Sequence, residues 1–465
     1  MTESFFQSRN PYNDQFIESF PALAPNDADA ALARADAAQR AWKATSLADR
    51  VSAIAAVADA LGARLDELAR TLALETGKPI TQGRAEVTKC IALCRYYADV
   101  AVDRLAPSPL DIPAVNAVIR YEPIGVVLGV MPWNYPIWQT LRFAVPSLLV
   151  GNGVILKPAP NVVRTSIGIE EVLKQAGLPD QVFQTLLLTE SHTLDRIRDD
   201  PRIAAVTVTG SDRAGQAIAG AAGSALKKSV LELGGSDAFV VLDDADVDAA
   251  ARAATASRTQ NTGQSCIAAK RFIIHRQVAG DFLDRMEESM SAIRAGDPLA
   301  DSTELGPLAR GDVRDRLQAQ VDASVDAGAH RRLGGRLPEG AGFGYLPTIL
   351  TDVDPASPAW CEETFGPVAA VRVVADADEA LALANASRYG LGASRWTADP
   401  ERAAALVPRF EAGMVAVNDM VRSDPRIPFG GVKHSGYGRE LGDWGLSEFA
   451  NIKTVQTPSW SHDAR

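Results

Sequence analysis

From Tyr121 onward, short apolar runs alternate with segments of helical spacing, and this alternation constrains the fold more than any other feature of the chain. Strands that are apolar along their whole length and are joined by helices form a mostly parallel sheet, covered by helices on both faces. The chain is therefore predicted to be a doubly wound α/β protein, and such sheets bind ligands beyond the carboxyl ends of their strands. The expected strands of this run are Ile124–Met131, Gly153–Leu156, Val182–Leu188, Ala204–Thr209 and Ser229–Leu233.

Two further regions lie on either side of this run. Residues 27–75 are alanine-rich and carry one apolar stripe at helical spacing, which predicts a scaffold helix. Ser46 with Asp49 resembles a capping box, and Gly77 is a stop signal. A second α/β run extends to about residue 435. The other expected elements are helices Ile137–Leu149 and Asp244–Arg258, a helix that ends near Gly177, and strands Ala238–Val241 and Arg271–Ile274.

Two segments outside the runs are predicted to be accessory elements. They are Pro107–Arg120 and the tail after Ala450, in which Ile452, Thr454 and Val455 alternate with polar residues. Both are expected to pair as edge strands and to extend a sheet across a subunit boundary. The chain is thus expected to form a homodimer or a homotetramer.

The composition excludes several classes of partner. A net charge of −11 disfavours nucleic acid and anionic membranes as main partners, and no apolar stretch is long and unbroken enough to span a bilayer. Four cysteines are too few for a disulfide framework, and the N-terminus lacks the features of a signal peptide, so the expected location is cytoplasmic. The five histidines are scattered, and no metal site is predicted.

The sequence contains weak signals for a phosphate site. No Gly-x-Gly-x-x-Gly follows a strand, so the common dinucleotide fingerprint is absent. Instead, the strand that ends at Thr209 leads through Gly210 and Ser211 into a helix containing Gly215, and the N–H groups of such a helix start can bind a pyrophosphate. Lys157 ends another strand, where it could reach a ribose or a phosphate, although an ordinary surface lysine is the simpler interpretation.

Cys266 is the last residue of a polar, glycine-containing stretch that begins at Gln260. A thiol of lowered pKa is a strong nucleophile, and Glu232 upstream could act as general base for a later attack by water. Asn134 lies at the end of an expected strand, and its amide is a neutral donor suited to an oxyanion. Taken alone, such a cysteine is more often inert than catalytic, and Asn134 also suits a rigid turn.

These motifs, together with Cys361–Pro367 and Pro428–Gly436, stand in an order and spacing that resemble the aldehyde dehydrogenase superfamily over nearly the whole chain. Within the superfamily the chain is most similar to bacterial succinate-semialdehyde dehydrogenases, including the runs Leu156–Asn161 and Ala204–Gly215. The resemblance implies a Rossmann-type cofactor domain at residues 1–104 and 124–234, an α/β catalytic domain at 235–435, and a small β oligomerisation element at 105–123 and 450–465.

The resemblance implies NAD(P)-dependent oxidation of an aldehyde through a cysteine thiohemiacetal and a thioester. Cys266 would be the nucleophile, Glu232 the base for thioester hydrolysis and Asn134 an oxyanion donor, while Glu440 would be the second glutamate of the family, which assists proton removal. The residues implied for the cofactor site are Trp133, Leu233 and Gly215, Lys157 at the adenosine ribose, Gly210 and Ser211 at the pyrophosphate, and Glu363 at the nicotinamide ribose with Phe365 nearby.

Selectivity is where the sequence departs from the family pattern. A distal carboxylate needs a cation or several donors, and the resemblance implies a substrate site with Arg142 and Ser423. Arg426, like Arg422, lies beside Ser423 and could supply a further cation. Gln260, however, stands where some relatives have a second arginine. Pro160 stands where NAD-preferring members often have a glutamate, which predicts that both NAD and NADP are used.

The sequence therefore predicts NAD(P)-dependent oxidation of succinate semialdehyde to succinate. An alternative within the same chemistry is a dehydrogenase for glutarate semialdehyde or for general aliphatic aldehydes. A cofactor-independent cysteine thioesterase is a more distant alternative, since such an enzyme would not need the motifs of a dinucleotide site.

Overall fold

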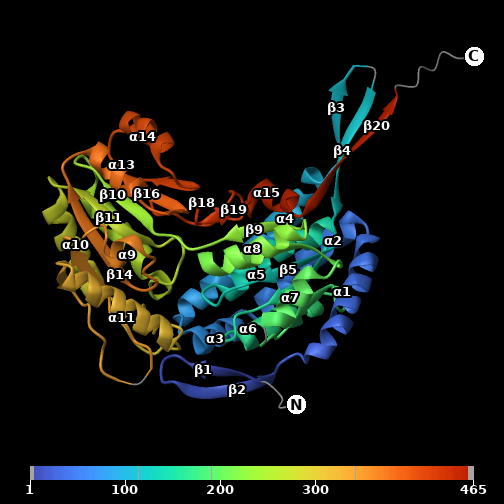
Figure 1. Cartoon of the computed structure of the whole chain (residues 1–465), viewed down its shortest axis with the longest axis horizontal. Coiled ribbons are helices and arrows are strands. Elements are labelled where there is room, and N and C mark those ends of the chain that lie inside the picture. The colour runs from blue at the N-terminus through green and yellow to red at the C-terminus, as the bar shows by residue number, and fades with distance from the viewer. Residues whose placement is uncertain (1–4, 114, 190, 341, 459–465) are drawn as a thin grey trace, which may run out of the picture.

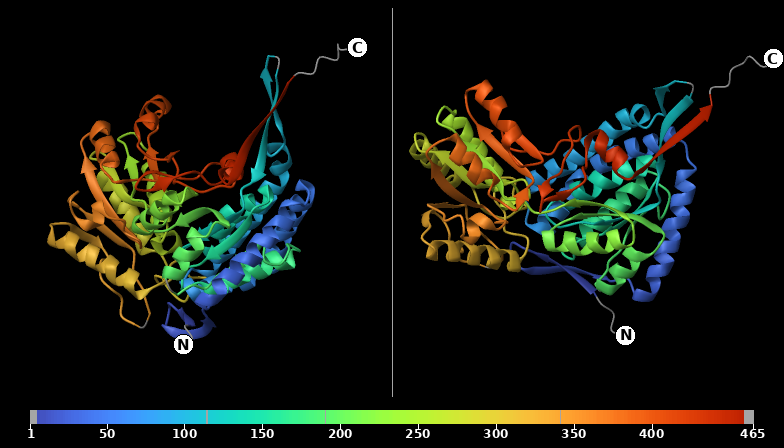
Figure 2. Two further views of the ribbon diagram at one scale, coloured as in Figure 1. Left: turned by 45° about the vertical axis from the view of Figure 1, so that its right-hand side comes forward. Right: turned by 45° about the horizontal axis from the view of Figure 1, so that its top comes forward.

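The structure is a computed structural model, and it describes residues 5–113, 115–189, 191–340 and 342–458. Figures 1 and 2 show one α/β body formed mostly by the first half of the chain and a second formed mostly by the second half. A narrow sheet projects from the first body. No helix of the described residues is long and apolar enough to cross a membrane.

Six strands form the sheet of the first body. They are β5 (Val126–Val130), β6 (Gly153–Lys157), β7 (Phe183–Thr185), β8 (Ile203–Thr209), β9 (Lys228–Glu232) and β19 (Gly436–Tyr437). Their order across the sheet is β19-β9-β8-β5-β6-β7, and all neighbours are parallel except β19 and β9. The chain thus starts in the middle, fills one side and then the other, which is the strand order of Rossmann-type folds.

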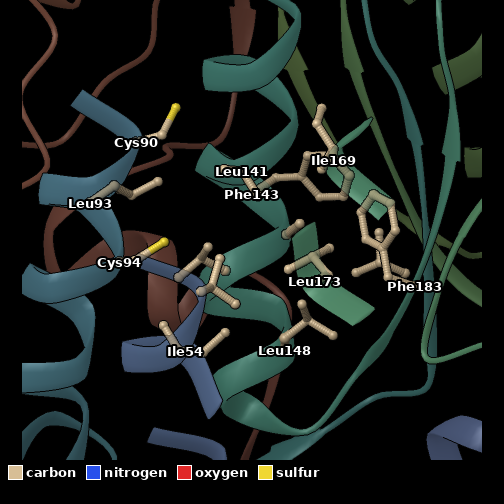
Figure 3. Close-up of a cluster of buried hydrophobic side chains, with 14 of the residues drawn as sticks. Ile54, Cys90, Leu93, Cys94, Leu141, Phe143, Leu148, Ile169, Leu173 and Phe183 are labelled. Carbon is tan, nitrogen blue, oxygen red and sulfur yellow. The ribbon is translucent and has the colours of Figure 1, made fainter. Parts of the chain in front are cut away.

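Helices cover both faces of this sheet because successive strand residues point to opposite sides. On one face Val127 and Val154 pack against α2 (Leu47–Ala63), α4 (Ile80–Arg104), α5 (Pro136–Val150) and α6 (Val163–Gln175). Figure 3 shows the side chains of this core, where α4 and α5 meet. On the other face Val126 and Leu128 pack against α1 (Ala28–Lys43), α7 (Ser191–Asp199) and α8 (Asp212–Ser224). The prediction of a doubly wound sheet is confirmed.

The N-terminal helices differ from their predicted form. The segment 27–75 is not a single scaffold helix, because α1 ends at Lys43, before the cap at Ser46, and the backbone leaves helical geometry again at Arg64 (φ −110°, ψ 16°), between α2 and α3 (Leu65–Thr76). The predicted cap is confirmed, since the Ser46 side chain accepts a hydrogen bond from Asp49 N, and Gly77 (φ 73°) ends α3. The short hairpin β1 (Phe5–Asn10) and β2 (Gln15–Pro21), and the turn η1 (Pro25–Asp27), were not predicted.

The second body has a seven-stranded sheet in the order β12-β13-β14-β11-β10-β16-β17, parallel except at β12. Its strands are β10 (Asp237–Val241), β11 (Ala269–His275), β12 (His330–Leu333), β13 (Thr348–Thr351), β14 (Val368–Val374), β16 (Gly392–Trp396) and β17 (Met414–Val417). On one face lie α9 (Val247–Thr259) and α10 (Ala279–Ser291). On the other lie α11 (Gly311–Asp326), α12 (Pro358–Cys361), α13 (Ala377–Asn385) and α14 (Pro400–Leu406), which η3 (Val407–Arg409) follows.

The end of the chain returns to the first body. After β15 (Tyr389–Gly390) pairs with β18 (Val432–Lys433), β19 joins the first sheet beside β9, with Gly436 opposite Glu232. The helix α15 (Gly442–Glu448) then packs against α5 and α4. This return brings Glu440 to the carboxyl end of β9, the edge where parallel sheets bind ligands.

The projecting sheet consists of β3 (Ser108–Ile112), β4 (Val115–Pro123) and β20 (Ala450–Pro458) in the antiparallel order β20-β4-β3 (Figure 1). The predicted pairing of the two accessory segments is therefore confirmed. Apolar side chains on it are exposed, among them Leu110, Ile112 and Ile452. Residues 459–465 of the predicted oligomerisation element lie outside the described residues.

Candidate active site

Cys266 follows a sharply turned loop between α9 and β11. In the turn η2 (Gln260–Gly263), Asn261, Thr262 and Gly263 have left-handed backbone with φ of 51°, 55° and 72°. Only glycine fits at the third position, because a Cβ on Gly263 would lie 2.4 Å from the carbonyl carbon of Gly366. Consecutive left-handed residues of this kind are strained and are concentrated at functional sites.

A buried lysine holds the carbonyl groups around the thiol. Lys270 Nζ donates hydrogen bonds to the carbonyl oxygens of Ser265, Cys266 and Ala268, at 3.0, 2.9 and 3.1 Å. The side chain is fully buried and lies 3.8 Å from Glu363 Oε1. One ammonium group therefore fixes the backbone on both sides of the nucleophile candidate, and it adds a positive charge beside it.

Asn134 reaches the same loop from the first sheet, where it follows β5. Its Nδ2 donates a hydrogen bond to the Gln264 carbonyl at 3.0 Å, and Asn261 Nδ2 donates one to the Asn134 carbonyl at 2.8 Å. The Asn134 side chain is buried. Because an amide nitrogen carries two protons, one N–H of Asn134 remains for an oxyanion next to Cys266.

Glu232 is the last residue of β9 and is buried. Neither of its carboxylate oxygens has a hydrogen-bond partner among the residues that the structure describes. Burial raises the pKa of this carboxyl well above its usual range, and the charge of Arg142 opposes the rise only in part. Once ionised, Glu232 is therefore an unusually strong base for a carboxylate.

Arg142 and Glu440 form a buried ion pair, between the guanidinium Nε and the Oε2 of the carboxylate. Arg142 belongs to α5, and its guanidinium also stacks 4.5 Å from the centroid of the Phe429 ring. Burial raises the pKa of Glu440, while Arg142 lowers it. Arg142 therefore already has a carboxylate partner within the protein, independent of any ligand.

The Cys266 thiol differs from the activated thiol that the sequence argument required. Burial raises the pKa of Cys266 to about 12, because the opposing effects of Arg142 and Lys270 are smaller. The free enzyme therefore holds a neutral thiol at physiological pH. The proton must leave when the substrate is in place, and Arg142 and Lys270 are the cations whose charges favour the thiolate.

Two cavities meet at the thiol, and both are lined by Cys266 and Gln139. Cavity 1 has a volume of about 280 Å³ and extends past the end of β9 to the start of α8. Cavity 2 has a volume of about 320 Å³ and extends between α4, α5 and the segment 420–423. The arrangement allows two different molecules to approach the same sulfur atom.

Cavity 1 contains most of the residues predicted to bind a dinucleotide. Those that line it are Trp133, Gly210, Ser211, Leu233, Glu363 and Phe365, together with the catalytic candidates Asn134 and Glu232. Gly215 does not line it. Its absent side chain serves packing instead, since a Cβ there would lie 2.5 Å from Leu233 Cδ2. Lys157 ends β6 outside the lining, where burial lowers its pKa, and its contact with a ribose remains a prediction.

The residues of cavity 1 fit a dinucleotide. Ser211 caps α8 by accepting a hydrogen bond from Ala214 N, and Gly210 beside it has no atom within 4 Å of where a Cβ would be. The positive end of a helix and an open backbone suit a pyrophosphate. Glu363 Oε1 accepts a hydrogen bond from Gly235 N at 3.0 Å, which leaves its second oxygen for a ribose hydroxyl.

Aromatic rings complete this cavity. Trp133 and Phe365 pack edge to face, with ring centroids 5.6 Å apart. The two rings come from different bodies and form an apolar wall suited to a flat ring near Cys266. Among the described residues, no group of three or more His, Cys, Asp or Glu side chains is placed to hold a metal ion.

Cavity 2 contains two of the three residues predicted to bind the substrate. Arg142 and Ser423 line it, as does Gln260. Arg426 does not, because its exposed side chain pairs with Asp424 through the guanidinium Nε, at 2.8 Å. Arg426 therefore lies at the surface outside cavity 2, and its contact with the substrate stays a prediction.

Several residues of the site were missed by sequence reasoning. Gln139 lies between the two cavities, and Arg388 lines cavity 1. Lys270 and Arg258 bind loop carbonyls from within the core, and Lys89 lines cavity 2. None belongs to a glycine-rich or acidic motif. The spacing of Gln139, five residues after Asn134 on an apolar helix, was the one available signal.

The family comparison covers most of the chain. The profile of the family described as "Aldehyde dehydrogenase family" matches residues 1–455. A probable succinate-semialdehyde dehydrogenase [NADP(+)] from Synechocystis sp. is 46% identical over 446 residues, which cover 96% of this chain and 98% of the relative. A succinate-semialdehyde dehydrogenase [NADP(+)] from Mycobacterium avium is 45% identical over 450 residues, covering 96% and 95% of the two chains.

Two solved structures are also similar to this chain over nearly its whole length. The succinic semialdehyde dehydrogenase from Streptococcus pyogenes, in complex with NADP+, aligns with a TM-score of 0.95 and 33% identity, over 98% of this chain and 100% of that one. A lactaldehyde dehydrogenase aligns almost as well, with a TM-score of 0.94 and 30% identity over 98% and 96% of the two chains. The fold is thus common to enzymes of different substrates.

Proposed function

Because this chain belongs to the aldehyde dehydrogenase family, we propose that it oxidises succinate semialdehyde to succinate, with NADP or NAD as the cofactor. The observation that carries the proposal is the position of Cys266, where a cavity suited to a dinucleotide meets a second cavity lined by cationic side chains. The relatives named as NADP(+)-dependent succinate-semialdehyde dehydrogenases support the choice of substrate.

The first half of the reaction takes place at the sulfur atom. The Cys266 thiol loses its proton to water, and its sulfur attacks the aldehyde carbon that has entered from cavity 2. The carbonyl oxygen becomes an oxyanion of a thiohemiacetal, stabilised by the free N–H of Asn134 and by the backbone N–H of Cys266. The nicotinamide ring of the cofactor supplies an acceptor for the hydride that leaves this carbon. Loss of the hydride leaves a thioester on Cys266.

The second half releases the acid. Glu232 accepts a proton from water, and the hydroxide attacks the thioester carbon, so that the C–S bond breaks and succinate departs. The raised pKa of Glu232 suits this role, since the driving force for proton transfer grows with the basicity of the acceptor. Glu440 lies beside the pathway, paired with Arg142, and is placed to assist removal of the proton.

The selection between NAD and NADP depends on the region after β6. Pro160 is exposed and carries no carboxylate, so nothing at this position repels a 2′-phosphate, while Lys157 supplies a cation nearby. We propose that NADP is used and that NAD is also accepted. Comparison of kcat/KM for the two cofactors tests this, and strict rejection of either one contradicts dual use.

We also propose that the protein is a cytoplasmic homo-oligomer. The exposed apolar residues of the β20-β4-β3 sheet support a homodimer or homotetramer in which this sheet meets a second copy. The domain limits proposed from the resemblance are 1–104 with 124–234, 235–435, and 105–123 with 450–465. The four cysteines, all free, support a reducing cytoplasm.

A panel of aldehydes tests the proposed function. The substrates are succinate semialdehyde, glutarate semialdehyde and butanal, each assayed with NADP and with NAD by the absorbance of the reduced nicotinamide. Succinate semialdehyde is expected to have the highest kcat/KM. A higher value for glutarate semialdehyde or for butanal would overturn the substrate assignment, and an absence of reduced nicotinamide with every aldehyde would overturn the activity itself.

A further inference from the structure

Three positively charged side chains line cavity 2, and two of them already have a carboxylate partner. Arg142 pairs with Glu440, and Arg422 pairs with Asp419 at 3.0 Å. The third is Lys89, and within the described part of the chain no carboxylate lies at ion-pairing distance from its Nζ. Lys89 is thus the cation of this cavity whose charge is not balanced by a direct partner.

The position of Lys89 follows from the geometry of α4. Gln82, Ala85, Glu86 and Lys89 are spaced at i, i+3, i+4 and i+7, so they share one face of the helix, and all four line cavity 2. This face is directed at the substrate side of the site. A lysine on the opposite face of α4 would reach solvent instead.

Two neutral groups orient the ammonium group. Lys89 Nζ donates a hydrogen bond to the Ser423 hydroxyl oxygen, and it lies 4.1 Å from the centroid of the Trp138 ring. A π face and a hydroxyl oxygen both stabilise a cation without neutralising it. The Ser423 hydroxyl keeps its own proton, which it can donate to a ligand oxygen.

The charges in the cavity favour an anion. Burial lowers the pKa of Lys89 to about 8, and the charge of Arg142 contributes to the fall. Two like charges that are directed into one partly desolvated cavity repel each other, and a bound carboxylate removes this cost. Gln260 lines the same cavity and supplies no charge there.

We propose that Lys89, together with Ser423, binds the distal carboxylate of the aldehyde substrate and so supplies the cation that Gln260 does not. The inference rests on the proposed function, because it names the group that recognises the carboxylate of that substrate. Arg142 has a different task, since its charge is already shared with Glu440 beside the reaction centre. Lys89 is therefore the residue that separates carboxylated from neutral aldehydes of the same length.

Substitution of Lys89 tests the inference through a ratio. The ratio is kcat/KM for succinate semialdehyde divided by kcat/KM for butanal, so a general loss of activity cancels. Lys89→Met is expected to lower it by about 10- to 100-fold, the effect of losing a charge-assisted hydrogen bond. Lys89→Arg is expected to restore most of it, because the charge is kept. Arg422→Met is the matched control, since its cation lines the same cavity but pairs with Asp419.

The effect of Lys89→Met is expected mainly in KM and less in kcat. Lys89→Met is expected to raise KM for succinate semialdehyde more than it lowers kcat, since the carboxylate contact is the same in the ground state and the transition state. A ratio unchanged in Lys89→Met, or an equal fall in Arg422→Met, would overturn the inference. If the wild-type enzyme itself does not prefer succinate semialdehyde to butanal, the proposed substrate fails first, and the inference fails with it.

The wild-type enzyme provides a second test that needs no variant. The groups that face Lys89 are Glu86 and Cys90 on its own helix, Arg142 on α5 and Asp424 in the loop after β17. Lys89 is charged below its pKa of about 8 and neutral above it, so carboxylate binding is lost as the pH rises. The same ratio is expected to fall by up to about tenfold per pH unit above this value. A ratio that stays constant up to pH values well above 8 would overturn the inference.

Discussion

The nucleophile loop 260–266 and the segment 419–427 both border the substrate, yet they are held in opposite ways. The first is mostly buried, and its polar groups bond to residues far away in the chain, among them Gln82, Gly306 and Ala309. The second is more exposed, and its charged side chains pair with neighbours two or three residues away. The chemistry is thus fixed by a network across both bodies, whereas the charged side chains of the second segment are held by local contacts.

Mutations in the two regions should therefore have different effects. A change in the first region should impair turnover of every aldehyde, because it moves or removes groups around the sulfur atom. A change to the surface ion pairs of the second should leave both turnover and the preference among aldehydes nearly unchanged, because such pairs interact only weakly.

Removal of the nucleophile should have the largest effect. Cys266→Ser is expected to lower kcat by at least about 10⁴-fold, because a hydroxyl at this position is a far weaker nucleophile than a thiolate. Formation of reduced nicotinamide measures the loss. Cys361→Ser is the matched control, since Cys361 is exposed and lines neither cavity. A comparable loss in the control would contradict the assignment.

Glu232→Gln should block the second half of the reaction. We expect kcat to fall by about 10³-fold, because the amide cannot accept a proton from water. In the wild-type enzyme, kcat should rise with pH through the raised pKa of Glu232, since only the ionised form is a base, and the variant should lose this rise. Glu170→Gln removes a half-buried carboxyl of raised pKa outside both cavities, and it should keep the wild-type pH profile.

Asn134→Ala removes the proposed oxyanion donor. The expected loss in kcat is about 10²-fold, with little change in KM, because the oxyanion exists only after the aldehyde has been attacked. Steady-state kinetics with succinate semialdehyde measures both constants. Asn385→Ala, which removes an amide that also bonds to backbone groups but lies outside both cavities, should leave kcat unchanged. A fall confined to KM in Asn134→Ala would refute the oxyanion role.

Lys270→Met tests whether the loop must be held. Three carbonyl oxygens lose their donor, so the free energy of unfolding should fall by about 2–4 kcal/mol, and kcat by about tenfold as the thiol loses its fixed position. Denaturant unfolding and kinetics measure the two effects. Lys227→Met is the control, because Lys227 also donates to carbonyl oxygens, those of Arg198 and Asp200, away from the site. Stability should fall in both variants, kcat in Lys270→Met alone.

Arg426→Ala should have the smallest effect. Its pair with Asp424 is exposed, and such surface pairs contribute little. The kcat/KM values for succinate semialdehyde and for butanal are expected to stay within about twofold of the wild type. A selective loss for the carboxylated aldehyde would show that Arg426 moves into cavity 2 when substrate binds, and it would contradict the division between the two regions.

The fold could be predicted to the extent that its segments are patterned locally. Runs such as Ala204–Thr209 and Ala238–Val241 are apolar along their length, so their burial inside parallel sheets is legible in the sequence. The hairpin β1–β2 could not be predicted in this way. Its strands are largely exposed, and they reach the core through Phe6, Phe20 and the hydrogen bond from Ser8 to Glu75, which is 67 residues away.

The residues of the site show the same difference between local sequence patterns and distant contacts. Cys266, Glu232 and Asn134 lie in motifs whose residue types are unusual for their local setting, so sequence reasoning found them. Lys89 and Lys270 look like ordinary lysines of a helix and a strand. Their roles arise only from partners elsewhere, such as Ser423, which is 334 residues from Lys89. The raised pKa of Cys266 was not legible either, because it depends on burial between two bodies.

In the proposed reaction, Cys266 carries the acyl group between the two halves. Mass spectrometry of the Glu232→Gln variant, mixed with succinate semialdehyde and NADP, tests this role directly. One succinyl group is expected on the peptide that contains Cys266, formed together with one equivalent of reduced nicotinamide. Reduced nicotinamide formed at the wild-type rate with Cys266 unmodified would contradict it.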